Sequence, residues 1–301
     1  MRLQRTIGRE VELVGVGLHR GETTRLRIVP APVGTGMVFV RDDLGGEEVP
    51  ALQQYRVPMV NASRLRRGAA TVETPEHLLA ALFCLGVDNV RLHLDGSEVP
   101  ILDGSSLPFA WALVGAGTVE QEAPRPTLAI HTSLSVEEDD RGLEIHPGRG
   151  LQLTAAIDFE HRHLGYQELT VRLDQQADFL AKLAPARTFA LRRDIQRLQE
   201  AGLIRGGSLD NAILVDEDGI QGGSLRFPDE FVRHKLLDLV GDLALLGCSL
   251  EGRIVAWRAG HGLHGRLVDA ILAHRQCWAM APDGSLADPP ASPAPPGSER
   301  Q

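Results

Sequence analysis

The sequence predicts an α+β protein of two domains, and three observations carry this prediction. Segments in which apolar and polar residues alternate are separated by Gly and Pro, which is typical of antiparallel strands. Segments with helix start and stop signals occur in both halves of the chain. The 301 residues exceed what one hydrophobic core usually fills, and the polar, proline-containing stretch QEAPRPT at 121–127 separates two apolar stretches. We therefore expect one domain at 1–122 and a second at 127–280.

The first half is expected to begin as sheet, with strands at 24–29 and 36–40. A helix follows, because Thr74 can cap it, Pro75 suits its first position, and Gly86 can end it about three turns later. A strand at 87–94 comes next. This half therefore has the mixed composition of an α+β domain.

The second half repeats this plan. Strands are expected at 128–136, 151–159, 168–173 and 254–257, and helices at 189–201 and 229–246. In both halves a helix ends in Leu-Gly before a strand, which weakly supports duplication. From 281 to 301 the chain is proline-rich and weakly apolar, so we expect a disordered tail.

Composition excludes several classes of protein. A net charge of −9 disfavours nucleic-acid binding, which needs a concentrated basic surface. The three cysteines form no CxxC pair, which suits a reducing compartment, and the charged start MRLQRTIGRE does not read as a secretory signal. No stretch reaches the roughly 18 apolar residues that span a bilayer. We expect a cytoplasmic protein without a transmembrane segment.

The segment RFPDEFVRHKLLDLVGDL could hold metal ligands on one face of a helix. At about 100° per residue, His234, Asp238 and Asp242 fall within roughly an 80° arc, opposite an apolar side. An imidazole and a carboxylate four residues apart can bind one Zn²⁺ ion, although a third protein ligand is then required. The alternative is a solvated face on which the carboxylates pair with Arg233 or Lys235.

Two further segments could complete such a site. Glu76 and His77 lie in the first turn of the first-half helix, where one can serve as ligand and the other as base; a structural role at the helix dipole is the alternative. His261 stands between two glycines, which would leave its ring accessible, although an exposed turn explains it equally well. His19 and the pair His161 and His163 are weaker candidates.

Six motifs in order connect these residues: TVETPEHLLAAL, PILDGSSLPF, ARTFALRRDI, RGGSLDNAILV, RFPDEFVRHKLLDLVGDL and AGHGL. This series resembles the UDP-3-O-acyl-N-acetylglucosamine deacetylases of lipid A synthesis, from residue 5 to about 278. The resemblance implies two similar α+β domains, stacked so that their helices lie between two sheets. It also implies an insert near 43–67 and a second near 188–222, which lines a passage for the substrate's acyl chain.

The resemblance further implies a zinc-dependent hydrolysis of the N-acetyl group of UDP-3-O-(3-hydroxyacyl)-N-acetylglucosamine, which releases acetate and the free amine. The implied zinc ligands are His77, His234 and Asp238. The implied catalytic residues are Glu76 as general base and Thr188, whose hydroxyl stabilises the oxyanion. Cationic His261 lies near that oxyanion, and Asp242 orients the histidine and stabilises its charge. Either His261 or Glu76 protonates the leaving amine.

Substrate contacts are expected from Lys235, Phe189, Gly207, His19 and His146. Three positions depart from the family pattern. His146 stands before Pro147 where many members have lysine, GHGLH replaces the common GHALN, and Ile204 replaces a cysteine found in some members. These departures concern the diphosphate and the acyl chain.

Two other functions stay open. The chain could be a zinc hydrolase that acts on a different acylated amino sugar. It could also be a binding protein with a structural zinc, although such sites usually have four protein ligands and the sequence offers no evident fourth. If the chain is the UDP-3-O-acyl-N-acetylglucosamine deacetylase that the resemblance implies, we expect its partner to be a UDP-linked acylated amino sugar. We then expect a monomer that binds no nucleic acid.

Overall fold

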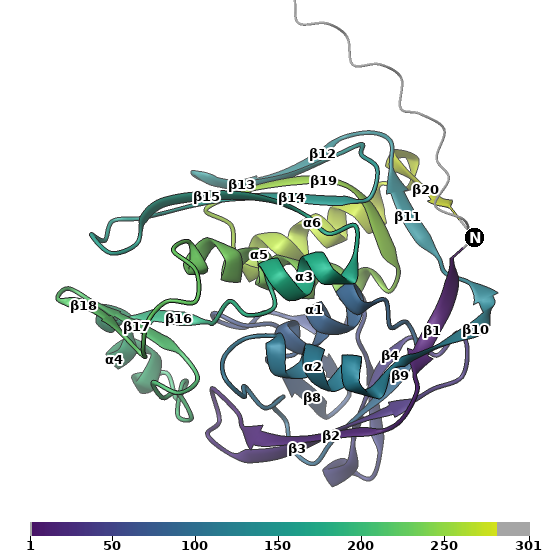
Figure 1. Cartoon of the computed structure of the whole chain (residues 1–301), viewed down its shortest axis with the longest axis horizontal. Coiled ribbons are helices and arrows are strands. Elements are labelled where there is room, and N and C mark those ends of the chain that lie inside the picture. Colours follow the sequence, from purple (N-terminus) through teal and green to yellow (C-terminus); the bar gives the residue numbers. More distant parts are fainter. Residues whose placement is uncertain (1, 282–301) are drawn as a thin grey trace, which may run out of the picture.

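The protein is described from a computed structural model, which covers residues 2–281 and has the predicted α+β fold. Helices lie between two β-sheets, one formed from the first half of the chain and one from the second (Figure 1). Apart from Ala281, the tail predicted to be disordered lies outside the described residues. Strand β1 (Leu3–Ile7) pairs with β10 (Thr118–Pro124), so the predicted boundary at 121–127 overlaps a strand end. The division into two domains stays a prediction.

The first sheet has five strands in the order β2-β3-β9-β4-β5. The bounds are β2 (Val11–Val16), β3 (Thr23–Pro30), β9 (Val90–Leu94), β4 (Met37–Arg41) and β5 (Glu47–Pro50). Its pairs are antiparallel except β4 with β9, which is parallel. In β3 the buried residues alternate with exposed ones, as predicted for a sheet with one face on the core.

The second sheet has seven strands centred on β19 (Ser249–Trp257). The others are β11 (Thr127–Ile130), β12 (Leu134–Glu138), β13 (Arg141–His146), β14 (Leu151–Phe159), β15 (Gly165–Arg172) and β20 (Trp278–Ala281). Strand β19 runs antiparallel to β13 and parallel to β11 and β14. The single strand expected at 128–136 was wrong, because the chain leaves β11 after Ile130 and starts β12 at Leu134.

Helix α1 (Glu76–Leu85) confirms the predicted first-half helix, but not its predicted cap. Thr74 makes no side-chain cap; it has a positive φ of 55° and its hydroxyl donates to Glu98 Oε1 at 2.9 Å. At the other end, Gly86 has a φ of 69° and its N–H bonds to the carbonyls of Leu82 and Phe83, as expected of a terminating glycine.

The layer between the sheets contains α1 together with α2 (Leu107–Ala116), α3 (Gln176–Lys182), α5 (Glu230–Leu243) and α6 (His261–Ala273) (Figure 1). Helix α5 packs against α1, α6, β14 and β15. A Cβ atom added at Gly241 would lie 2.2 Å from the carbonyl oxygen of Glu76. Glycine at this position therefore lets the backbones of α5 and α1 approach closely, which brings their side chains to one place.

Two small sheets are formed at or near the predicted inserts. Strands β6 (Arg56–Val57), β7 (Arg64–Arg67) and β8 (Ala70–Glu73) form one, and β16 (Phe189–Leu191), β17 (Ile213–Asp216) and β18 (Gly219–Gln221) form the other. Strand β8 lies just beyond the predicted 43–67. The helix expected at 189–201 is shorter, because 189–191 pair in parallel with β17 and only α4 (Arg192–Glu200) is helical. Within residues 2–281, no helix combines the length and apolar character needed to cross a bilayer.

Candidate active site

The three predicted metal ligands converge at the contact between α1 and α5. His77 lies in the first turn of α1, and His234 and Asp238 lie one turn apart on α5. Asp238 Oδ1 is 3.6 Å from His77 Nε2 and 3.3 Å from His234 Nε2. The edge of a tetrahedron around Zn²⁺ with bonds of about 2.0–2.1 Å measures about 3.4 Å. The two distances to Asp238 therefore come close to the spacing that such an ion requires, and all three ligand atoms lie within 4.8 Å of one another.

The protonation states of these residues also fit a cation. His234 Nδ1 lies 3.0 Å from the carbonyl oxygen of Ala186, which leaves Nε2 free to face Asp238, and burial lowers the pKa of His234 to about 3. Burial alone would raise the pKa of Asp238, but His234 and Lys235 outweigh it and hold that pKa well below its usual range. A neutral imidazole and an ionised carboxylate are the forms in which these residues bind metals.

Glu76 is a buried carboxylate beside this group. Its Oε1 lies 3.8 Å from His261 Nε2, and its Oε2 accepts a 3.3 Å hydrogen bond from the backbone N–H of Ser63. Burial raises the pKa of Glu76 to about 7, against the opposing charges of His261 and His77. A carboxyl with a pKa near neutrality can both accept and release a proton at physiological pH.

His261 is oriented by Asp242. Gly260 precedes α6, so His261 is the first residue of a helix rather than part of a turn. Its Nδ1 lies 2.7 Å from Asp242 Oδ2, and its Nε2 lies 3.8 Å from Asp238 Oδ2. Burial disfavours the cationic ring, but Asp242 outweighs burial and raises the pKa of His261 to about 9. The imidazole is therefore cationic at neutral pH.

Two residues that the sequence did not single out also bind Asp242. His264 Nδ1 lies 2.8 Å from the same Oδ2 atom, and the hydroxyl of Ser63 donates to Oδ1. His264 stands three residues after His261, so the helical period could have indicated it. Ser63 has no such local signal, since it reaches the site only through the tertiary fold.

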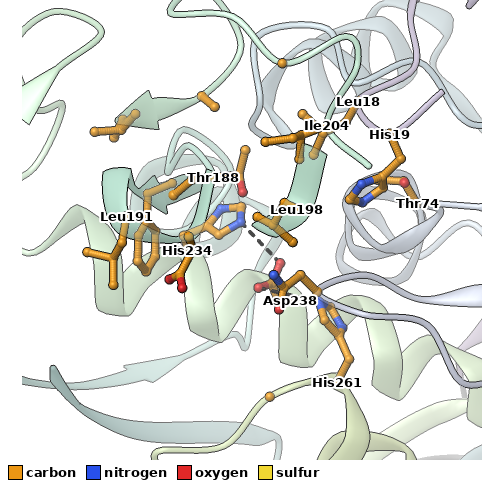
Figure 2. Close-up of a pocket in the computed structure, with 18 of the residues that line it drawn as sticks. Leu18, His19, Thr74, Thr188, Leu191, Leu198, Ile204, His234, Asp238 and His261 are labelled. Carbon is orange, nitrogen blue, oxygen red and sulfur yellow. Dashed lines mark ion pairs between the residues drawn. The ribbon is translucent and has the colours of Figure 1, made fainter. Parts of the chain in front are cut away.

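A cavity of about 590 Å³ extends from these polar groups into the second insert (Figure 2). Thr188, Lys235, Phe189, Gly207 and His19 all line it. The apolar residues of the second insert that line it are Phe189, Ala190, Leu191, Ile195, Leu198, Ile204, Leu209, Ala212 and Ile213. The cavity thus joins a group of ionisable side chains to an apolar compartment.

The predicted substrate contacts differ in their surroundings. Lys235 Nζ is 2.9 Å from Asp238 Oδ2 and 5.5 Å from the ring centroid of Phe189. His19 is buried, and its two ring nitrogens have no hydrogen-bond partner among the described residues. His146 is not among the cavity-lining residues; its ring nitrogens contact Ser133 Oγ at 2.9 Å and Glu144 Oε2 at 2.8 Å. Its position gives no support to a substrate contact within this cavity.

Two histidines and a carboxylate that could hold one cation, with a buried carboxylate beside them whose pKa is near neutrality, form an arrangement typical of metal-dependent hydrolases. The family model for UDP-3-O-acyl N-acetylglycosamine deacetylase (LpxC) matches residues 4–273. The chain belongs to this deacetylase family.

Individual relatives agree with this assignment. The UDP-3-O-acyl-N-acetylglucosamine deacetylase of Myxococcus xanthus is 44% identical, over 93% of this chain and 89% of that protein. The enzymes of the same name from Anaeromyxobacter sp. and Chromohalobacter salexigens are 44% and 42% identical, over 96% and 91% of this chain and 94% and 92% of those proteins. The similarity therefore covers nearly the whole length of each relative.

Proposed function

We propose that the protein removes the N-acetyl group of UDP-3-O-(3-hydroxyacyl)-N-acetylglucosamine in lipid A biosynthesis, with zinc bound by His77, His234 and Asp238. The products are acetate and the free amine. The observation that carries the proposal is the junction of this ligand group with the apolar cavity of about 590 Å³. An N-acetylated, acylated amino sugar has an amide, which would lie at the ionisable end of the cavity, and an acyl chain, which would bind in the apolar compartment.

Zinc, when bound, supplies Lewis acidity that polarises an amide carbonyl and makes water a stronger acid. Glu76 is the general base that takes the proton of the attacking water, since its burial gives it a pKa of about 7. The Thr188 hydroxyl, at the cavity wall, donates a hydrogen bond to the carbonyl oxygen as negative charge develops there. Lys235 adds positive charge at the same end of the cavity.

The amine must be protonated before it leaves. One proton is needed, and two groups can supply it: His261, which is cationic, buried and 3.8 Å from Glu76, through its Nε2, or Glu76, by returning the proton that it took from water. Asp242 stabilises the cation and fixes which ring nitrogen faces the substrate. The environments of the two residues give them different pKa values: burial raises the pKa of Glu76, and the Asp242 carboxylate raises the pKa of His261.

The direct test incubates zinc-loaded protein with UDP-3-O-acyl-N-acetylglucosamine and measures released acetate. We expect acetate and free amine in equal amounts. Chelation of the zinc should abolish the release of both, because none of the residues that line the cavity supplies equivalent Lewis acidity. Release that persisted after complete chelation would contradict the zinc mechanism. No release from folded, zinc-loaded protein would instead favour a different acylated amino sugar or a binding role.

We expect kcat/KM to follow a bell-shaped pH profile. The rate should rise as Glu76 loses its proton, with a pKa of about 7, and fall as His261 loses its proton, with a pKa of about 9. A bound cation disfavours protons nearby, so both limbs should lie at or below these values. Asp242→Asn should move the alkaline limb to lower pH, because the Asp242 charge raises the pKa of His261. An alkaline limb that does not move in this variant would contradict the pairing.

A cytoplasmic location and a monomeric state stay predictions of the sequence. Both are consistent with a UDP-linked sugar as partner. Gel filtration of the full chain and fractionation of cells that express it test them directly.

A further inference from the structure

Ser63 contacts two carboxylates that come from different helices. It is buried and stands in the segment between β6 and β7. Its backbone N–H donates to Glu76 Oε2 at 3.3 Å, at the start of α1, and its hydroxyl donates to Asp242 Oδ1, near the end of α5. Ser63 therefore links the general base to the carboxylate that orients His261.

The backbone of Ser63 is anchored. Its carbonyl oxygen accepts a hydrogen bond of 3.0 Å from the N–H of Thr74, and the next residue, Arg64, pairs with Glu73 in the β7–β8 ladder. These contacts hold Ser63 next to the strand that leads directly into α1. Its hydroxyl is consequently a donor with a set position rather than one on a free loop.

The hydroxyl determines how Asp242 is held. Oδ2 of Asp242 already contacts Nδ1 of both His261 and His264, at 2.7 and 2.8 Å. The hydrogen bond from Ser63 occupies the other oxygen, so the carboxylate has donors on both sides and its plane is fixed. Without that donor, a buried oxygen loses its partner and the carboxylate can turn to seek another. The Nε2 atom of His261 would then lose its set distance from Glu76.

We propose that Ser63 is a positioning residue, which keeps Asp242, and through it His261, in register with Glu76. This inference rests on the proposed deacetylase function. Ser63 does not line the cavity, whereas Met59 and Asn61 of the same segment do. Its effect should therefore fall on turnover and not on substrate binding.

The test compares Ser63→Ala with Ser63→Thr in zinc-loaded full-length protein. For Ser63→Ala we expect kcat to fall about tenfold, because a buried hydrogen bond to a charged group contributes roughly the free energy that corresponds to a tenfold change in rate. KM should stay within about twofold of the wild-type value. Ser63→Thr keeps the hydroxyl and should restore kcat to within about twofold. Thermal unfolding and zinc content are measured on each variant, so that a loss of folded or loaded protein is not mistaken for slower turnover.

Ser249→Ala is the matched control. The Ser249 hydroxyl, in β19, is also buried but has no hydrogen-bond partner among the described residues, so its removal should leave kcat unchanged. If Ser63→Ala does not fold, Ser63→Cys keeps a similar shape but replaces the hydroxyl by a thiol, which is a much weaker donor, and serves in its place. A reduced kcat at unchanged KM in that variant supports the role, and a wild-type kcat overturns it.

The outcomes separate this inference from the function on which it rests. A wild-type protein that releases no acetate would overturn both. A wild-type protein that releases acetate, together with a Ser63→Ala variant of unchanged kcat, would overturn the role of Ser63 alone. A Ser63→Ala variant that lowers only the melting temperature, or one that raises KM instead of lowering kcat, would also overturn it.

Discussion

Replacing Glu76 with Gln should lower kcat for acetate release by about 10³-fold, within the range of a lost general base. The amide keeps the shape of the side chain but cannot accept the proton of water at neutral pH. Glu76→Ala should lose as much, and both variants should keep zinc, because Glu76 is not among the three atoms spaced for the ion. Steady-state acetate release and metal analysis of the same samples measure the two effects.

A surface carboxylate provides the control for Glu76. Glu120 is exposed and pairs with Arg5 in the β1–β10 ribbon, so Glu120→Gln should leave turnover and zinc content unchanged. If Glu76→Gln retained more than about a tenth of wild-type turnover, the general base would have to be another group.

Replacing His234 with Ala should remove both zinc and activity. His234 is one of the three proposed ligands, and its partner on the next turn, Asp238, would remain buried with Lys235 as its main counter-charge. We expect zinc affinity to fall by more than the 10–100-fold that is typical when only a residue outside the ligand set is changed. Equilibrium dialysis with zinc, followed by metal analysis and acetate assay, gives the result.

The control for His234 is a histidine that pairs with a carboxylate elsewhere. His93 Nδ1, in β9, lies 2.8 Å from Asp42 Oδ1, and His93 is not among the residues that line the cavity. His93→Ala should keep zinc and turnover. Normal zinc stoichiometry and affinity in His234→Ala would exclude this histidine as a ligand.

Local sequence signals predicted the parts of the fold that local forces determine. Gly86 ends α1 because a positive φ suits glycine, and the alternation in 151–159 corresponds to β14 with the predicted bounds. Where tertiary pairing overrides local preference, the prediction was wrong: residues 189–191 continue a helical pattern, but they pair with β17. Helix α2 was missed because its residues are almost uniformly apolar and show no helical stripe.

The site was predictable to a similar extent. His234 and Asp238 could be placed together because a helix brings residues four apart to one face. Glu76 and His77 were candidates from their place in the first turn of a helix, and the motif series implied their separate roles. Ser63 could not be found, because it is far from Asp242 in the sequence and meets it only where the first insert packs against α5. The position of His146 likewise depends on the pairing of β13, which a motif alone does not reveal.

The close approach of α5 to α1 at Gly241 has a thermodynamic consequence. In the proposed zinc site one ligand belongs to α1 and two belong to α5, so the complete set of proposed ligands exists only while the two helices are packed together. An ion that binds the packed form alone stabilises that form by mass action, in proportion to RT ln(1 + [L]/Kd). The proposed site thus predicts that metal supply and conformational stability are linked: scarcity of the ion should weaken the packing of α1 against α5 as well as the chemistry at their contact.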